Sequence, residues 1–105
     1  MNIDNLNWHD GVLIETSFYI DKKGQSKLVV IADFYSNEDS KKRSKYKISC
    51  EGVVKCNLSL DAVELRDNMF AGNISNGYLK TKTFWLYFTD GVLEVTAQDF
   101  DVVQC

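Results

Sequence analysis

The sequence predicts an all-β, mainly antiparallel domain, and three observations support this. Apolar residues alternate with polar ones along most of the chain, which is the period of a half-buried strand. Polar clusters and turn-forming pairs divide these runs at short intervals. No helical period between the runs is long enough for a parallel crossover. We expect a seven- or eight-stranded β-sandwich or β-roll with one short helix; the alternative is an α+β domain with a single sheet.

Length and composition predict a single domain over residues 1–105. The chain is 45% hydrophobic and 26% charged, and its net charge of −3 gives no global attraction to nucleic acid or to an anionic membrane. No apolar run approaches the roughly 18 residues that span a bilayer. The N-terminal residues also lack the basic and apolar regions of a secretory signal. We therefore expect a cytoplasmic protein with no membrane partner.

The first half of the chain predicts four strands. Residues 12–20 and 28–35 alternate regularly, and the polar turn 21–25 between them predicts a hairpin. After a solvated connection, residues 46–50 and 54–60 alternate as two half-buried strands. The segment Glu51-Gly52-Val53 is expected to separate these two strands.

The second half predicts the helix and the remaining strands. Asp61 and Glu64 resemble a capping box, which predicts about two helical turns near 61–69. Residues 71–77 are expected to form a loop or an irregular strand start. The remaining strands are expected over 83–89, 92–98 and 100–103.

One eight-residue pattern occurs twice: HDGVLIET at 9–16 and TDGVLEVT at 89–96. An Asp-Gly pair between alternating apolar residues is typical of a tight hairpin turn, which we expect at Asp90-Gly91. At the first copy we expect Asp10 to accept backbone N–H bonds and Gly11 to take the left-handed conformation. Asp10-Gly11 is therefore predicted to start a strand.

The three cysteines, Cys50, Cys56 and Cys105, are expected to be free thiols, because their number is odd and no signal peptide precedes them. By alternation, Cys50 and Cys56 point to the apolar face, where a buried cysteine is usually inert. A zinc site needs about four ligands, and the chain has one histidine. We therefore expect no metal and no cofactor.

Of the polar pairs in the chain, His9 and Asp10 are the best suited to acid–base chemistry. Imidazole titrates near neutral pH, so one hypothesis is a small enzyme that uses His9 with a carboxylate. The favoured interpretation is structural: His9 packs beside Trp8 and is hydrogen-bonded to backbone. A Cys–His enzyme would need a cysteine beside His9, which the pattern does not predict.

A basic cluster occupies residues 41–47. Nucleic-acid binding would require exposed aromatic residues among these charges, but the alternation places Tyr46 on the apolar face of its strand. Lysines on the solvent side of an edge strand also discourage aggregation. We therefore expect no nucleic-acid partner.

The segment FWLYF at 84–88 is apolar on both faces, with Trp85 and Tyr87 opposite the other three residues. Such a strand is either covered on both sides or exposed at a binding surface. One interpretation is an inner strand covered by the helix near 61–69. The other is a surface for a protein partner or a second copy of the chain, since Trp and Tyr dominate interface energetics. The predicted contact residues are Trp85, Tyr87, Tyr19 and Tyr35.

Three segments together resemble a group of small bacterial all-β proteins that begin with an aromatic-His-Asp motif: WHDGVLIE at 8–15, YKISCEGV at 46–53 and NISNGY at 73–78. This group includes immunity proteins of polymorphic toxin systems. Gly11 departs from the group, which often has a small residue such as alanine there. The resemblance implies a cytoplasmic, non-enzymatic binding role, and no catalytic residues carry over from it.

Three functional hypotheses follow. The first is a non-catalytic cytoplasmic protein-interaction domain, of the toxin-neutralising immunity type, whose partner is a toxin or a second copy in a homodimer. The second is a small-ligand-binding β-domain with its pocket between two sheets. The third is the small enzyme based on His9.

Overall fold

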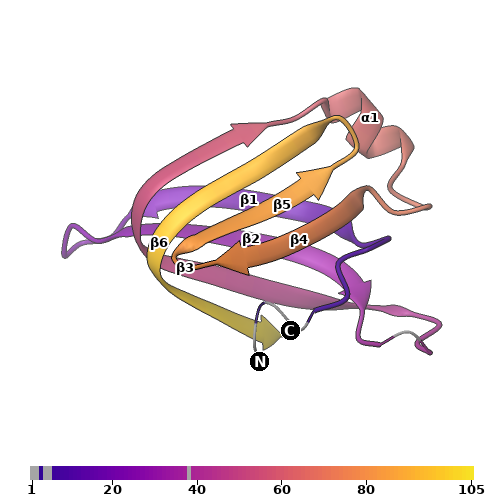
Figure 1. Cartoon of the computed structure of the whole chain (residues 1–105), viewed down its shortest axis with the longest axis horizontal. Coiled ribbons are helices and arrows are strands. Elements are labelled where there is room, and N and C mark those ends of the chain that lie inside the picture. Colours follow the sequence, from indigo (N-terminus) through magenta and orange to yellow (C-terminus); the bar gives the residue numbers. More distant parts are fainter. Residues whose placement is uncertain (1–2, 4–5, 38) are drawn as a thin grey trace.

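The computed structural model describes residue 3, residues 6–37 and residues 39–105, and these form one antiparallel sheet of six strands plus a short helix. The sheet order is β1-β2-β3-β6-β5-β4 (Figure 1). The all-β prediction is confirmed, with six strands in place of seven or eight. The elements are β1 (Val12–Ile20), β2 (Ser26–Tyr35), β3 (Arg43–Ser59), α1 (Ala62–Asp67), β4 (Ile74–Lys80), β5 (Thr83–Phe88) and β6 (Gly91–Gln104).

The strand count is lower because β3 and β6 are each continuous where the sequence predicts a break. β3 runs for 17 residues and β6 for 14. Gly52 has φ 64°, and the pairing register with β6 shifts between Val53 and Lys55, which leaves Val54 as a bulge residue. A bulge bends a strand without ending it. The prediction that Glu51-Gly52-Val53 separates two strands is therefore wrong.

β3 and β6 bend from one layer of the molecule into the other (Figure 1). The first half of β3 pairs with β2 on one side and with the end of β6 on the other. The second half of β3 pairs with the start of β6, which in turn pairs with β5. One layer thus holds β1, β2 and the first half of β3, and the other holds β4, β5 and the second half of β3.

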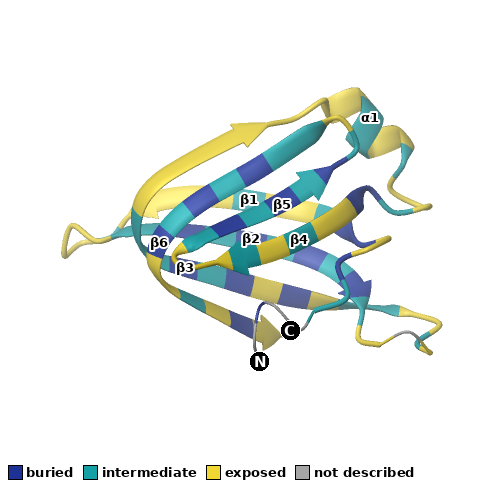
Figure 2. Cartoon of the chain, in the orientation of Figure 1, coloured by how far each residue is buried: buried dark blue, intermediate teal, exposed yellow. Residues whose placement is uncertain are grey.

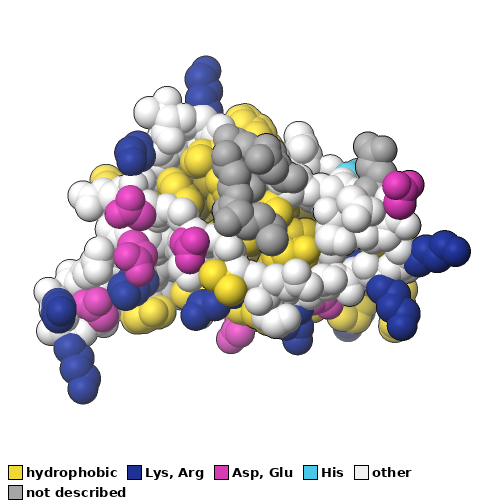
Figure 3. Space-filling model, turned by 90° about the horizontal axis from the view of Figure 1, so that it is seen from below, with side chains coloured by type: hydrophobic (Ala, Val, Ile, Leu, Met, Phe, Trp, Pro, Cys, Tyr) yellow, Lys and Arg dark blue, Asp and Glu magenta, His cyan; other side chains and the backbone are white. Residues whose placement is uncertain are grey.

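The core lies between the inner faces of the two layers. Alternate residues of β2, β5 and much of β6 are buried, and they form dark blue bands along these strands in Figure 2. Trp8 lies between the layers: its ring centroid is 4.9 Å from that of Phe34 on β2 and 5.3 Å from that of Phe84 on β5. Figure 3 shows the molecule from the lower side, with hydrophobic side chains in the centre and most charged ones towards the ends.

Residues 71–77, expected to be a loop or an irregular strand start, contain the first half of β4, whose register against β5 shifts between Ile74 and Asn76. Asn76 and Gly77 interrupt the apolar alternation there. A Cβ on Gly77 would lie 2.9 Å from the Trp8 ring, so glycine is required there by close packing. Thr81, with φ 58°, lies in the turn between β4 and β5.

The two Asp-Gly pairs behave alike, but the prediction for Gly11 is wrong. The left-handed residues are Asp10 with φ 65° and Asp90 with φ 56°, a conformation that aspartate tolerates better than most residues. Gly11 is instead required by close approach, because a Cβ there would lie 3.0 Å from the Trp8 carbonyl oxygen. Asp10-Gly11 does precede β1, as predicted.

Asn73 ties together the ends of three elements. Its side-chain oxygen accepts from the Leu13 amide at 2.9 Å, and its side-chain nitrogen donates to the Leu65 carbonyl at 2.9 Å. Its backbone N–H donates to the Gly11 carbonyl at 2.8 Å, next to the isolated bridge between Gly11 and Ile74. Asn73 thus links β1, α1 and β4, and it is buried with its polar groups satisfied.

None of the helices in the described residues is both long and apolar enough to cross a membrane.

We expect Asn73→Ala to lower the free energy of unfolding by about 2–4 kcal/mol, because two backbone groups lose their partners in a partly buried site. Asn57→Ala is the matched control: Asn57 is exposed, so its loss should change stability by less than about 0.5 kcal/mol. Urea unfolding of the two variants measures the difference. Equal, small effects would contradict the structural role of Asn73.

Candidate functional site

Three aromatic side chains gather on the outer face of β4 and β5, and we call them the aromatic cluster: Tyr78, Trp85 and Tyr87. Tyr78 lies directly across from Trp85 in the β4–β5 pairing, and their ring centroids are 4.9 Å apart. The rings of Tyr78 and Tyr87 are stacked with centroids 6.1 Å apart. Trp85 and Tyr87 are half-buried and Tyr78 is exposed, so the cluster presents aromatic surface to solvent.

Polar groups hold the cluster in place. The Trp85 indole nitrogen donates to the Glu94 carboxylate at 2.9 Å across the β5–β6 pair. The hydroxyls of Tyr78 and Tyr87 are 3.5 Å apart, and this hydrogen bond is the main reason why the pKa of Tyr87 is raised. The cluster therefore combines stacked rings with polar tips at the surface, a composition common in binding surfaces.

The structure does not bring all four predicted contact residues together. Tyr19 lies on β1, paired with Lys27 of β2, in the other layer. Tyr35 lies at the end of β2, with the Arg43 guanidinium 5.2 Å above the centre of its ring. Only Trp85 and Tyr87 of the predicted set belong to the aromatic cluster. Tyr78 was not among the predicted contact residues, because its register against Trp85 follows from the β4–β5 hairpin.

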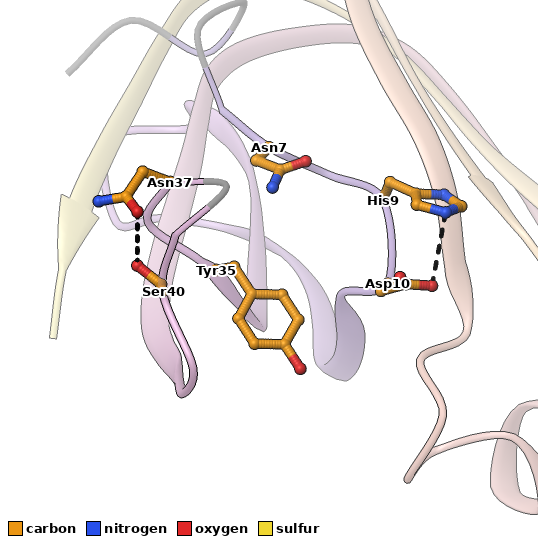
Figure 4. A pocket seen from close by; sticks show the side chains of 6 residues that line it. All are labelled: Asn7, His9, Asp10, Tyr35, Asn37 and Ser40. Atoms are coloured by element: carbon orange, nitrogen blue, oxygen red, sulfur yellow. Dashed lines mark hydrogen bonds and ion pairs between the residues drawn. The ribbon is translucent and has the colours of Figure 1, made fainter.

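A polar recess of about 450 Å³ lies beside the start of β1. In Figure 4, His9 and Asp10 stand on one side, Asn37 and Ser40 on the other, and Tyr35 between them. The loop side is preorganised, because the Asn37 side-chain oxygen accepts from the Asp39 amide and the Ser40 hydroxyl. The remaining lining residue is Asn7.

His9 and Asp10 are both exposed in this recess. The His9 Nε2 atom is 3.6 Å from the Asp10 carboxylate, with the His9 side chain 73% exposed, and His9 Nδ1 lies 3.3 Å from the Ser75 carbonyl oxygen. The residue packed in the core is Trp8, whereas His9 points outward (Figure 4).

Arg43 connects the recess to the rest of the fold. Its Nε atom donates to the Asp10 carbonyl at 2.8 Å, and its Nη2 atom donates to the Phe70 carbonyl at 3.3 Å. The first residue of β3 thus fixes two loops that meet beside the start of β1. Within the basic cluster at 41–47, Arg43 therefore has a structural role, and Tyr46 is buried, stacked on Phe34.

The thiols differ sharply in environment. Cys50 is buried in the core, where burial and the nearby Cys56 raise its pKa to about 12. Cys56 and Cys105 are exposed, and all three are free. No group of three or more His, Cys, Asp or Glu side chains within the described ranges is placed to hold a metal ion.

The chain was compared with family models, curated proteins and solved structures, and none of these matches it.

We expect a thiol reagent at pH 8 to modify Cys56 and Cys105 rapidly and Cys50 only after unfolding, because the reactive species is the thiolate. Mass spectrometry of peptides from native and denatured protein measures this order. A Cys50→Ala variant should show the same fast reaction as the original chain. Rapid native labelling of Cys50 would show that the core around it opens readily.

Proposed function

We propose that this chain is a non-catalytic protein-interaction domain that binds another protein through the aromatic cluster. The observation that carries the proposal is the presentation of Trp85, Tyr87 and Tyr78 on one outer sheet face. Large aromatic residues with polar tips contribute most of the binding energy in many protein interfaces. A cytoplasmic, toxin-neutralising role is the specific form that the sequence resemblance favours.

The electrostatics of this face support a protein partner over a nucleic acid. Glu94 contributes a carboxylate directly beside Trp85, which would repel a phosphate backbone. The net charge of the chain is also −3. The basic residues at 41–47 lie on a different part of the sheet, around the start of β3.

In the test, the wild-type chain is immobilised and a protein that it retains is identified. That protein is then purified and its binding to the chain is measured by calorimetry. We expect Trp85→Ala to weaken this purified complex by at least about 30-fold, or about 2 kcal/mol, as for a residue central to an interface. Tyr19→Ala and His9→Ala are controls on other surfaces and should stay within about threefold. Circular dichroism must show that Trp85→Ala is folded.

Equal losses in all three variants, or no loss in Trp85→Ala, would contradict the proposal. If the retained protein is a toxin, its activity should fall in proportion to the complex formed. If light scattering shows that the partner is a second copy, Trp85→Ala should yield the monomer.

The polar recess favours a second candidate function, binding of a small polar ligand. It is lined by an imidazole, a carboxylate, an amide and a hydroxyl, from His9, Asp10, Asn37 and Ser40, and such groups suit a ligand with several hydroxyls. One sequence-based hypothesis places a ligand pocket between two sheets, but core side chains occupy the space between the layers. The recess lies instead beside residues 7–10. An enzyme would act at this same place, using His9 and Asp10.

We expect Asp10→Asn to weaken the affinity for such a ligand by at least about tenfold, because a charge-assisted hydrogen bond is replaced by a neutral one. Calorimetry with a panel of monosaccharides and nucleosides measures this, with Lys41→Ala as the control. Unchanged affinity in Asp10→Asn would exclude this recess as the binding place. Turnover of a bound compound that is lost in His9→Ala would establish the enzyme instead.

A further inference from the structure

The second half of β3 has a free edge. β2 begins at Ser26, whose hydroxyl donates to the Val53 carbonyl at 2.6 Å. Beyond this point, none of the described residues of β1 or β2 pairs with β3, while β6 pairs with it as far as Ser59. Backbone donors and acceptors along this edge therefore face away from the sheet unpaired.

β1 has a second free edge on the same side of the molecule. β1 is terminal in the sheet order, and within the described residues it forms a ladder only with β2. Because β2 lies on the side of β3 opposite β6, the free edges of β1 and of the second half of β3 border the same side. We call this side, between residues 15–20 and 55–59, the open side. Both segments carry mostly exposed residues in Figure 2.

Core-facing apolar side chains are uncovered along the open side. Phe18 lies across from buried Leu28, yet it is 51% exposed. Leu58 lies across from buried Leu93, yet it is 47% exposed. Ile20 is 64% exposed, and Cys56, across from Val95, is also exposed. These residues point to the inner face, so their exposure results from missing cover and not from an outward orientation.

The start of β1 is covered, which limits the open side to the later residues of that strand. Trp8 fills the space between the layers there, and the bridge between Gly11 and Ile74 joins β1 to β4. Bulges at Ile14 and Val54 interrupt the regular strand pairing only at one end of each segment. The stretches 15–20 and 55–59 keep regular pairing with their inner neighbours.

We propose that the open side binds an extended segment of a partner protein, which adds to the free edge of β3 as a further strand. An unpaired edge favours a ligand with an extended backbone. The exposed core-facing side chains of the open side (the inner row: Phe18, Ile20, Cys56 and Leu58) favour apolar side chains at every second position of that ligand. The alternate side chains would face solvent beside Lys55, which favours an acidic residue there. The occupant is thus a strand with apolar residues inward and acidic or polar residues outward.

A second copy of the chain fits less well. Two copies paired through β3 would satisfy that edge, but each would leave Phe18 and Ile20 on β1 uncovered. An inserted strand contacts both rows, because its inward side chains lie between β3 and β1. The proposal is independent of the aromatic cluster, which lies on the outer face of β4 and β5.

The test uses a synthetic peptide, acetyl-Glu-Val-Glu-Val-Thr-Val-Glu-Val-Glu-amide, titrated into the whole chain. Calorimetry of the unlabelled chain measures binding, because a label on Cys56 would itself occupy the open side. We expect saturable binding. Leu58→Gln should weaken binding at least about tenfold, because it removes an inner-row contact. Asn57→Gln, one residue away on the outer face, should leave binding unchanged.

Two further controls separate the alternatives. The same peptide N-methylated at every second residue should not bind, because it lacks the donors for the β3 edge. Trp85→Ala should bind the peptide normally, so failure of the aromatic cluster as an interface would not affect this result. Absence of saturable peptide binding, equal binding of the N-methylated peptide, or a concentration-dependent dimer that Leu58→Gln dissociates would each overturn the proposal.

Discussion

The fold depends on one constraint: β3 and β6 must each form strand pairs in both layers of the molecule. Their pairing is the longest in the sheet, from Tyr46 opposite Gln104 to Ser59 opposite Val92. The bend at Gly52 carries β3 from one layer into the other. Because β2 has 10 residues and β3 has 17, β3 extends past its neighbour. The two-layer core and the open side are therefore consequences of the same geometry.

The outer edge of β1 differs along its length. Its start is covered by apolar and polar contacts, with the Trp8 ring between the layers and Asn73 joining β1, α1 and β4. Residues 15–20 and the facing edge of β3 leave apolar side chains and strand edges uncovered. A small domain gains stability from every covered apolar group, so the exposed inner residues Phe18 and Leu58 are the place where a bound strand would bury the most apolar surface.

Alternation correctly predicts the faces within regularly paired stretches, but it fails at the bulge residues Ile14 and Val54, which are exposed. It places Leu28, Val30 and Phe84 inward and Trp85 and Tyr87 outward, as the structure has them. Alternation does not predict where strands bend or how they register. Glycine in a strand marks a bend, a close approach or an end, and the sequence does not distinguish these cases at Gly52. Tyr78 and Asn73 acquire their roles only through long-range pairing, which local pattern does not contain.

β3 is paired on both sides in its first half and on one side in its second half, and both the two-layer core and the open side follow from this claim. Residue-resolved amide hydrogen exchange of the free chain tests this claim most directly. We expect slow exchange throughout residues 46–51, and alternation of slow and fast amides over residues 55–59. Uniformly slow exchange over 55–59 would show that the second edge is already covered, and would contradict the account.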